Sequence, residues 1–168
     1  MPERKQWTST QVVFFYPNLI GYLRFVALGV SLVFAMNKEM WPYFLLSFGM
    51  SYFLDVFDGK AARAFDQCTK YGAALDMVCD RASNATEYMI LSTIYPQASF
   101  AFYLCFLLDF GSHWLQFQAS AASGSHHKSK DASVNWLVSL YYNNDTVFRI
   151  VVGGAEIGTA FLYVIGQS

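Results

Sequence analysis

The sequence has 168 residues, which is enough for one domain. Hydrophobic residues make up 55% of it and charged residues only 14%, whereas an average soluble domain carries about 25% charged residues. The formal net charge is −1, and no basic patch is available to neutralise a nucleic-acid backbone. This composition argues against a nucleic-acid-binding protein and favours a protein embedded in the lipid bilayer.

Five apolar stretches approach the length of a membrane-spanning helix, which needs about 20 residues. The predicted helices cover 12–36, 41–57, 72–95, 98–117 and 146–165. The first is interrupted by Asn18 and Arg24, and the third has its polar residues crowded into its first half. The predicted fold is therefore all-α: a polytopic transmembrane helix bundle of about five helices in a single domain, 1–168.

Basic residues gather in three segments that fall on one side of the membrane if every predicted helix crosses it once. They are Arg4, Lys5, Lys60, Arg63, Lys70, Lys128 and Lys130. The opposite side holds only Lys38. Because cytoplasmic loops of membrane proteins are enriched in lysine and arginine, the three segments are expected to face the cytoplasm.

Four aspartates flank the connection between the second and third predicted helices. Asp55 and Asp58 are three residues apart, and Asp76 and Asp80 are four apart, so each pair shares one helical face. An antiparallel connection would bring the faces together, and four carboxylates that close repel one another unless cations neutralise them. Their oxygen atoms suit Mg²⁺ or Mn²⁺. We therefore predict a divalent metal site, in which two ions would polarise a diphosphate.

The residues between the two pairs suit a nucleotide diphosphate. Gly59 and Ala62 leave room for the close approach of a ligand, and Arg63 offers a planar guanidinium to phosphate. The Thr69 hydroxyl can donate a hydrogen bond, and Gly72 keeps the third helix open beside the metal site. Asp66, in contrast, is expected to be a solvated helix end.

The motif Asp58-Gly59-x2-Ala62-Arg63-x8-Gly72-x3-Asp76-x3-Asp80 resembles that of the CDP-alcohol phosphatidyltransferases. Asp55 stands where that family has an additional leading aspartate. From about residue 12 to 130, the chain resembles the eukaryotic members that use inositol. This similarity is carried by segments 16–24, 57–64, 72–77, 108–115 and 125–128.

The resemblance implies transfer of the phosphatidyl group from CDP-diacylglycerol to myo-inositol, giving phosphatidylinositol and CMP. It implies two Mg²⁺ or Mn²⁺ ions at the four aspartates, with Asp80 also acting as general base. It places CDP-diacylglycerol at Gly59, Arg63 and Thr69. It further implies a homodimer in the endoplasmic reticulum membrane with its active site facing the cytosol.

The family has six transmembrane helices and this sequence predicts five, so we expect a C-terminally shortened chain. Two alternatives stay open: the same chemistry on another alcohol, and an impaired shortened form acting as a structural or regulatory membrane protein. Intramembrane prenyltransferases also hold magnesium with aspartate-rich helices, but their acidic motifs lie far apart. Here all four carboxylates fall within 26 residues.

Polar residues on the first and fourth predicted helices allow two interpretations each. Asn18 either lines the nucleotide pocket or satisfies a neighbouring helix. Arg24 either contacts a phosphate or headgroup, or pairs with a carboxylate of a neighbouring helix. Asp109 and His113, four residues apart, either hydrogen-bond inositol hydroxyls or contact each other.

The remaining polar candidates are expected to be structural. Arg81 either tunes the charge of Asp80 or pairs with Glu87. The loop residues His126, His127 and Lys128 are expected to be solvated. Two triplets that match the N-glycosylation pattern begin at Asn84 and Asn144, and both are interpreted as chance.

Overall fold

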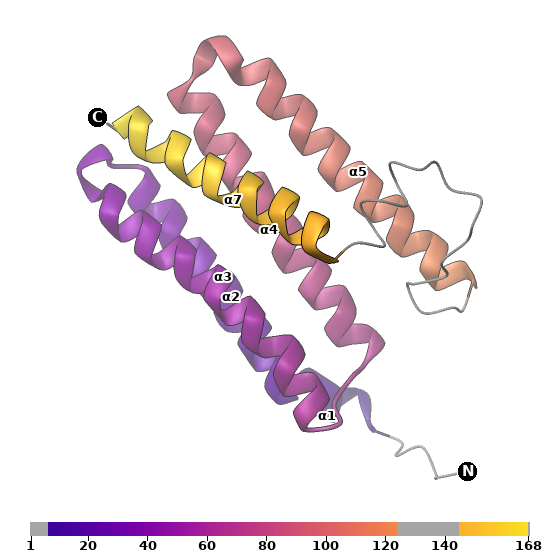
Figure 1. The fold of residues 1–168 in the computed structure, drawn as a ribbon. Coiled ribbons are helices and arrows are strands. Elements are labelled where there is room, and N and C mark those ends of the chain that lie inside the picture. Colours follow the sequence, from indigo (N-terminus) through magenta and orange to yellow (C-terminus); the bar gives the residue numbers. More distant parts are fainter. Residues whose placement is uncertain (1–6, 124–144, 168) are drawn as a thin grey trace. The chain divides into compact units, whose positions relative to one another are not determined.

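In the computed structural model, the described residues are 7–123 and 145–167, and they form helices without a strand (Figure 1). The elements are α1 (Ser9–Val13), α2 (Tyr16–Ala35), the short 3₁₀ helix η1 (Lys38–Met40), α3 (Trp41–Ala64), α4 (Lys70–Ile94), the 3₁₀ helix η2 (Pro96–Ala98), α5 (Ser99–Ser123) and α7 (Asp145–Gln167). The predicted all-α class is confirmed. The chain divides into two compact units, Met1–Thr86 and Glu87–Ser168.

The stretch predicted as one helix over 12–36 is two helices. Thr8 caps α1 through a reciprocal pair of hydrogen bonds with Gln11, and α1 ends at Val13. Phe15 is extended, with ψ of 145°, and α2 then begins with Pro17 in its first turn. Proline is favoured in the first turn of a helix because it lacks an N–H group, and the first N–H groups of a helix have no partner within the helix.

Helix α3 continues to Ala64, beyond the predicted end at residue 57. Its C-terminus carries two hydrogen bonds, from Gln67 N to Ala62 O at 2.9 Å and from Asp66 N to Arg63 O at 3.5 Å. This is the Schellman arrangement, which needs a left-handed residue after the helix. Asp66 fills that role with φ of 53°. Asp58 and Gly59 therefore lie within a regular helix rather than in a loop.

Helix α4 begins directly after this turn. The Thr69 hydroxyl accepts a hydrogen bond from Gly72 N at 3.0 Å, as an N-capping residue does for the third residue of a helix. Five residues, 65–69, thus join α3 to α4. The Schellman turn ends α3 and the Thr69 cap begins α4. Together they set how far each aspartate pair lies from the connection.

Small residues let the helices of the first unit approach closely. The Cys79 thiol on α4 donates to the carbonyl of Gly21 on α2 at 3.5 Å, and a Cβ added at Gly21 would lie 2.8 Å from Leu75 Cδ2. On the α3 side, the Ser51 hydroxyl donates to the Arg24 carbonyl at 3.3 Å. Glycine and serine at such contacts are typical of membrane helices. These close contacts of α2 with α3 and α4 bring the Arg24 side chain of α2 near both helices.

Two helices in the described ranges are long and apolar enough to cross a bilayer, Tyr16–Ala35 and Pro96–Ala119. Leu46 on α3 and Leu107 on α5 are 68% and 64% exposed. Exposed apolar surface of this kind marks contact with lipid or protein. With the length of the helices, it fits a membrane helix bundle, as predicted.

In the second unit, the end of α4 meets α7. The Tyr95 hydroxyl donates to the Leu162 carbonyl at 2.8 Å, and Leu91 and Tyr163 are buried. A Cβ added at Gly166 would collide with the Ile94 side chain. The glycine therefore allows close packing at this point.

Candidate metal centre

The two aspartate pairs come together on facing helices of the first unit. Asp55 and Asp58 lie on α3, and Asp76 and Asp80 lie in the first half of α4. Oxygen atoms of Asp55, Asp76 and Asp80 all lie within 4.8 Å of one another. The helical spacings and the short α3–α4 turn thus converge on one acidic cluster, in the arrangement that the sequence predicts.

A guanidinium lies among these carboxylates. Arg24 Nη1 is 2.7 Å from Asp58 Oδ2 and 2.8 Å from Asp76 Oδ1. Its Nη2 is 2.8 Å from Asp55 Oδ1 and 2.6 Å from Asp80 Oδ1. Each nitrogen therefore joins one aspartate of α3 to one of α4. The sequence allowed two interpretations of Arg24, and the structure shows the second, in which Arg24 pairs with carboxylates of neighbouring helices.

The cluster is buried on the arginine side and open on the carboxylate side. The Arg24 side chain is 3% exposed, whereas those of Asp55, Asp76 and Asp80 are 42%, 50% and 39% exposed. Four ionised carboxylates and one guanidinium leave a formal charge of −3. A cation can therefore reach the exposed carboxylate oxygens from solvent without first displacing the buried Arg24 side chain.

The donor set fits a divalent metal ion. Magnesium and manganese prefer carboxylate oxygens, and the cluster offers oxygen donors from three aspartates close enough to share an ion. Asp58, whose side chain is 11% exposed, is the most enclosed of the four. The residues therefore offer the type of oxygen donor that a divalent ion prefers.

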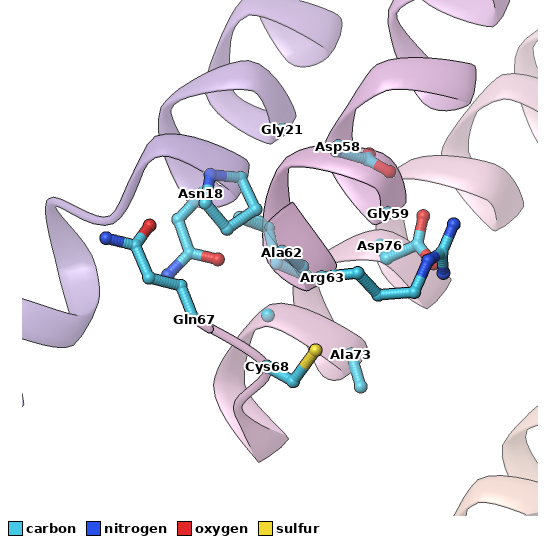
Figure 2. Close-up of a pocket in the computed structure, with 13 residues that line it drawn as sticks. Asn18, Gly21, Asp58, Gly59, Ala62, Arg63, Gln67, Cys68, Ala73 and Asp76 are labelled. Atoms are coloured by element: carbon cyan, nitrogen blue, oxygen red, sulfur yellow. The ribbon is translucent and has the colours of Figure 1, made fainter. Parts of the chain in front are cut away.

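A pocket of about 160 Å³ adjoins the cluster and is lined by Asp58, Gly59, Ala62, Arg63 and Asp76, among others (Figure 2). The Arg63 guanidinium lies over Gly59, with Nη1 3.5 Å from the position of an added Cβ. Pockets for drug-sized ligands have volumes of about 300–1,000 Å³. This pocket therefore suits one polar group, such as a phosphate, rather than a whole nucleotide lipid.

Asn18 and Gly72 line the same pocket from α2 and α4. A Cβ added at Gly72 would lie 3.0 Å from Asn18 Oδ1, so a larger residue here would press on the buried Asn18 side chain. The Asn18 amide nitrogen donates to the Val12 carbonyl. Thr69 lies beside these residues, but its hydroxyl caps α4 and it is not among the described residues that line the pocket. The sequence predicted substrate binding at Thr69 and did not foresee this capping role.

Gln67 and Cys68 also line the pocket, and sequence reasoning did not single them out. Gln67 Oε1 accepts a hydrogen bond from Tyr16 N at 3.0 Å, which ties the α3–α4 turn to the start of α2. Their position between Arg63 and Gly72 could have indicated this, because a turn that joins two site-forming helices lies close to the site. Side-chain direction within such a turn is not apparent from sequence spacing.

The predicted acceptor residues lie in the second unit. His113 Nδ1 is 2.8 Å from the Asp109 carbonyl and 3.5 Å from Asp109 Oδ1, so these residues contact each other. Their binding to inositol stays a prediction.

The other candidates lie on α4 after Asp80 or outside the described residues. Arg81 is partly buried and Glu87 is 7% exposed on α4. The Asn84 side chain accepts a hydrogen bond from Tyr52 at 3.3 Å. The loop candidates His126, His127, Lys128 and Asn144 lie outside the described residues.

Comparison with known proteins relates this geometry to a family. The chain is 42% identical over 149 residues to the CDP-diacylglycerol–inositol 3-phosphatidyltransferase of Candida albicans, covering 88% of this chain and 64% of that protein. The proteins of the same name from Rattus norvegicus and Homo sapiens are each 38% identical, over 94% and 91% of this chain and 73% and 71% of theirs. The chain thus spans about two thirds of the length of such relatives.

No solved structure is similar enough to this chain to count as a match. Residues 14–163 match the family described as CDP-alcohol phosphatidyltransferase. This range contains all four aspartates and the residues between them. The chain therefore belongs to the CDP-alcohol phosphatidyltransferase family.

Proposed function

We propose that this protein transfers the phosphatidyl group from CDP-diacylglycerol to myo-inositol, giving phosphatidylinositol and CMP. The observation that carries the proposal is the cluster of four aspartates around Arg24, beside a phosphate-sized pocket. The activity for which relatives 36–42% identical to the chain are named supports the two substrates. Function is argued from this site because a helical fold alone does not define a reaction.

The pocket residues would hold the diphosphate of CDP-diacylglycerol. The Arg63 guanidinium, exposed on α3 above Gly59, can donate two parallel hydrogen bonds to phosphate oxygens. Gly59 and Ala62 add little side-chain bulk on the same face. Asn18 also lines the pocket, and Thr69 caps the start of α4, which carries the lining residue Gly72. The acyl chains would lie in the bilayer beside the exposed apolar helix faces.

The reaction is a displacement at the phosphorus of the phosphatidyl group. The inositol hydroxyl oxygen forms the new bond, and the bond from that phosphorus to the CMP oxygen breaks. Asp80 takes the proton of the attacking hydroxyl as general base. Its side chain is 39% exposed while Oδ1 accepts from Arg24, so the carboxylate is oriented and still open to an incoming acceptor.

Asp55, Asp58, Asp76 and Asp80 would together hold divalent cations, Mg²⁺ or Mn²⁺ and two in number. Bound there, the cations would neutralise the charge of the diphosphate and of the departing CMP. Three of these aspartates already have oxygen atoms within 4.8 Å of one another, and Arg24 joins Asp58 to them, which reduces the reorganisation that metal binding requires.

The charge pattern supports a cytosolic position for the site. The α3–α4 turn is flanked by Lys60, Arg63 and Lys70, and basic residues mark the cytoplasmic side of a membrane protein. We infer that the site faces the cytosol from the endoplasmic reticulum membrane. A homodimer, and inositol contacts from Asp109 and His113, complete the proposal.

The test is a reconstituted assay with the purified protein in liposomes that contain CDP-diacylglycerol. Labelled inositol should enter lipid when Mg²⁺ or Mn²⁺ is present, and CMP should appear. Parallel reactions with serine, choline and glycerol phosphate test the acceptor. Activity with one of these and not with inositol would refute the proposed acceptor, and no CMP release with any of them would refute the proposed reaction.

A further inference from the structure

Arg24 has surroundings that phosphate transfer alone does not explain. It lies in the middle of the apolar helix α2, is 2% exposed, and contacts all four aspartates at 2.6–2.8 Å. A buried charge at membrane depth is costly, and such residues are usually functional. The four aspartates are the partners of this charge, because both terminal nitrogens of Arg24 contact their carboxylates.

The arginine makes a metal-free cluster of four carboxylates tolerable. Without a cation the four negative charges repel one another, since like charges that share a site disfavour ionisation. Arg24 Nη1 bridges Asp58 and Asp76, and Nη2 bridges Asp55 and Asp80. The single guanidinium therefore links α3 to α4 at two points and neutralises part of their charge.

The same contacts oppose a divalent ion. Mg²⁺ binds oxygen at about 2.0–2.1 Å and requires near-octahedral geometry, so it competes for the oxygens that Arg24 holds. A positive guanidinium a few ångströms from the ion also repels it. The Arg24 Nε is buried without a hydrogen-bond partner in the described part of the chain, so the side chain has one donor that its present position does not satisfy.

We propose that Arg24 is a resident counter-cation that holds the four carboxylates together in the metal-free protein and gives up some of them when a divalent ion binds. This inference rests on the proposed metal site of the phosphatidyltransferase. It makes Arg24 a positioning residue that lowers the affinity for the metal while it stabilises the four carboxylates before a metal binds. The two effects have opposite signs, and a purely structural arginine has only the second.

The test measures Mn²⁺ binding to the purified protein in detergent, without substrate, from the loss of the paramagnetic resonance signal of free Mn²⁺. Thermal unfolding in chelator and in Mn²⁺ gives the second readout. The variants are Arg24→Met, which removes the charge, and Arg24→Lys, which keeps the charge but not the fork. Lys60→Met is the matched control, because it removes an exposed positive charge of α3 that lies over the Phe57 ring.

Arg24→Met should bind Mn²⁺ at least tenfold more tightly than the unchanged protein and unfold at a lower temperature in chelator. Mn²⁺ should raise its unfolding temperature by more than it raises that of the unchanged protein. Arg24→Lys should bind Mn²⁺ at least threefold more tightly, because one ammonium cannot bridge four carboxylates. Lys60→Met should stay within twofold of the unchanged protein.

Unchanged or weaker Mn²⁺ binding in a folded Arg24 variant would overturn the inference. If Arg24→Met unfolds in chelator, its recovery by Mn²⁺ supports the counter-cation role, and failure to recover contradicts it. Absence of Mn²⁺ binding in the unchanged protein is a different result, because it would refute the metal site of the proposed function itself.

Discussion

Replacing Asp80 with asparagine separates the chemistry of the site from its architecture. The substitution keeps the shape of the side chain and an oxygen that can accept from Arg24 Nη2, now 2.6 Å from Asp80 Oδ1. It removes one of four like charges, so the loss of the ion pair and the relief of repulsion partly offset each other. Because three carboxylates still contact Arg24, the net cost in unfolding free energy should be smaller than the cost of leaving a buried charge without a partner, which is about 3–5 kcal/mol.

The effect on turnover should be far larger. General-base catalysis contributes about 10²–10⁴-fold in rate, which corresponds to about 2.7–5.4 kcal/mol of activation free energy at 1.36 kcal/mol per tenfold. Asp80→Asn should therefore lose at least about a hundredfold in kcat.

The assay is CMP release at saturating inositol, accompanied by thermal unfolding and by binding of CDP-diacylglycerol. Asp66→Asn is the matched control, since Asp66 lies in the exposed turn after α3 with φ of 53° and asparagine tolerates that conformation. Turnover of Asp80→Asn within tenfold of the unchanged protein would refute the role of Asp80 as base. An equal loss in Asp66→Asn would show that the effect is not specific to the cluster.

Three further predictions concern the walls of the site and its metal. Gly72→Ala should lower stability by about 1–3 kcal/mol, because its Cβ would lie 3.0 Å from Asn18 Oδ1. Gly49→Ala, which meets open space, should be neutral or stabilising in the same thermal unfolding assay; equal losses would contradict the argument. Gln67→Ala leaves Tyr16 N–H without its acceptor and should lower the free energy of unfolding by about 0.5–1 kcal/mol. Hydrogen exchange in the first turn of α2 should become faster, and unchanged exchange would count against this hydrogen bond. Chelation should abolish turnover and added Mg²⁺ or Mn²⁺ should restore it, whereas turnover that persists in chelator would exclude a divalent-metal mechanism.

Several features of the fold and site could be predicted from local sequence patterns. The helical spacings of Asp55 with Asp58 and of Asp76 with Asp80 depend only on helix geometry. A short turn between the helices then brings the pairs together. The break between α1 and α2 is visible afterwards in Pro17, but the apolar run through residues 12–16 concealed it, because hydropathy alone does not mark a helix start.

The contacts of Arg24 and Gln67 could not be predicted in the same way. Each joins residues far apart in sequence, Arg24 to aspartates 31–56 positions away and Gln67 to Tyr16. Such contacts depend on how closely α2 approaches α3 and α4, and this approach depends in turn on the small residues Gly21 and Ser51. The extension of α3 through Asp58 likewise depends on the Schellman turn at Asp66.

The central claim is that this acidic cluster transfers a phosphatidyl group from CDP-diacylglycerol directly to inositol. The most direct measurement follows CMP and labelled phosphatidylinositol in the same reaction, with purified protein, Mg²⁺ or Mn²⁺, and CDP-diacylglycerol in liposomes. The account predicts equal amounts of the two products at every time point and neither product when inositol is left out. CMP release without inositol, or lipid labelling without CMP, would contradict it.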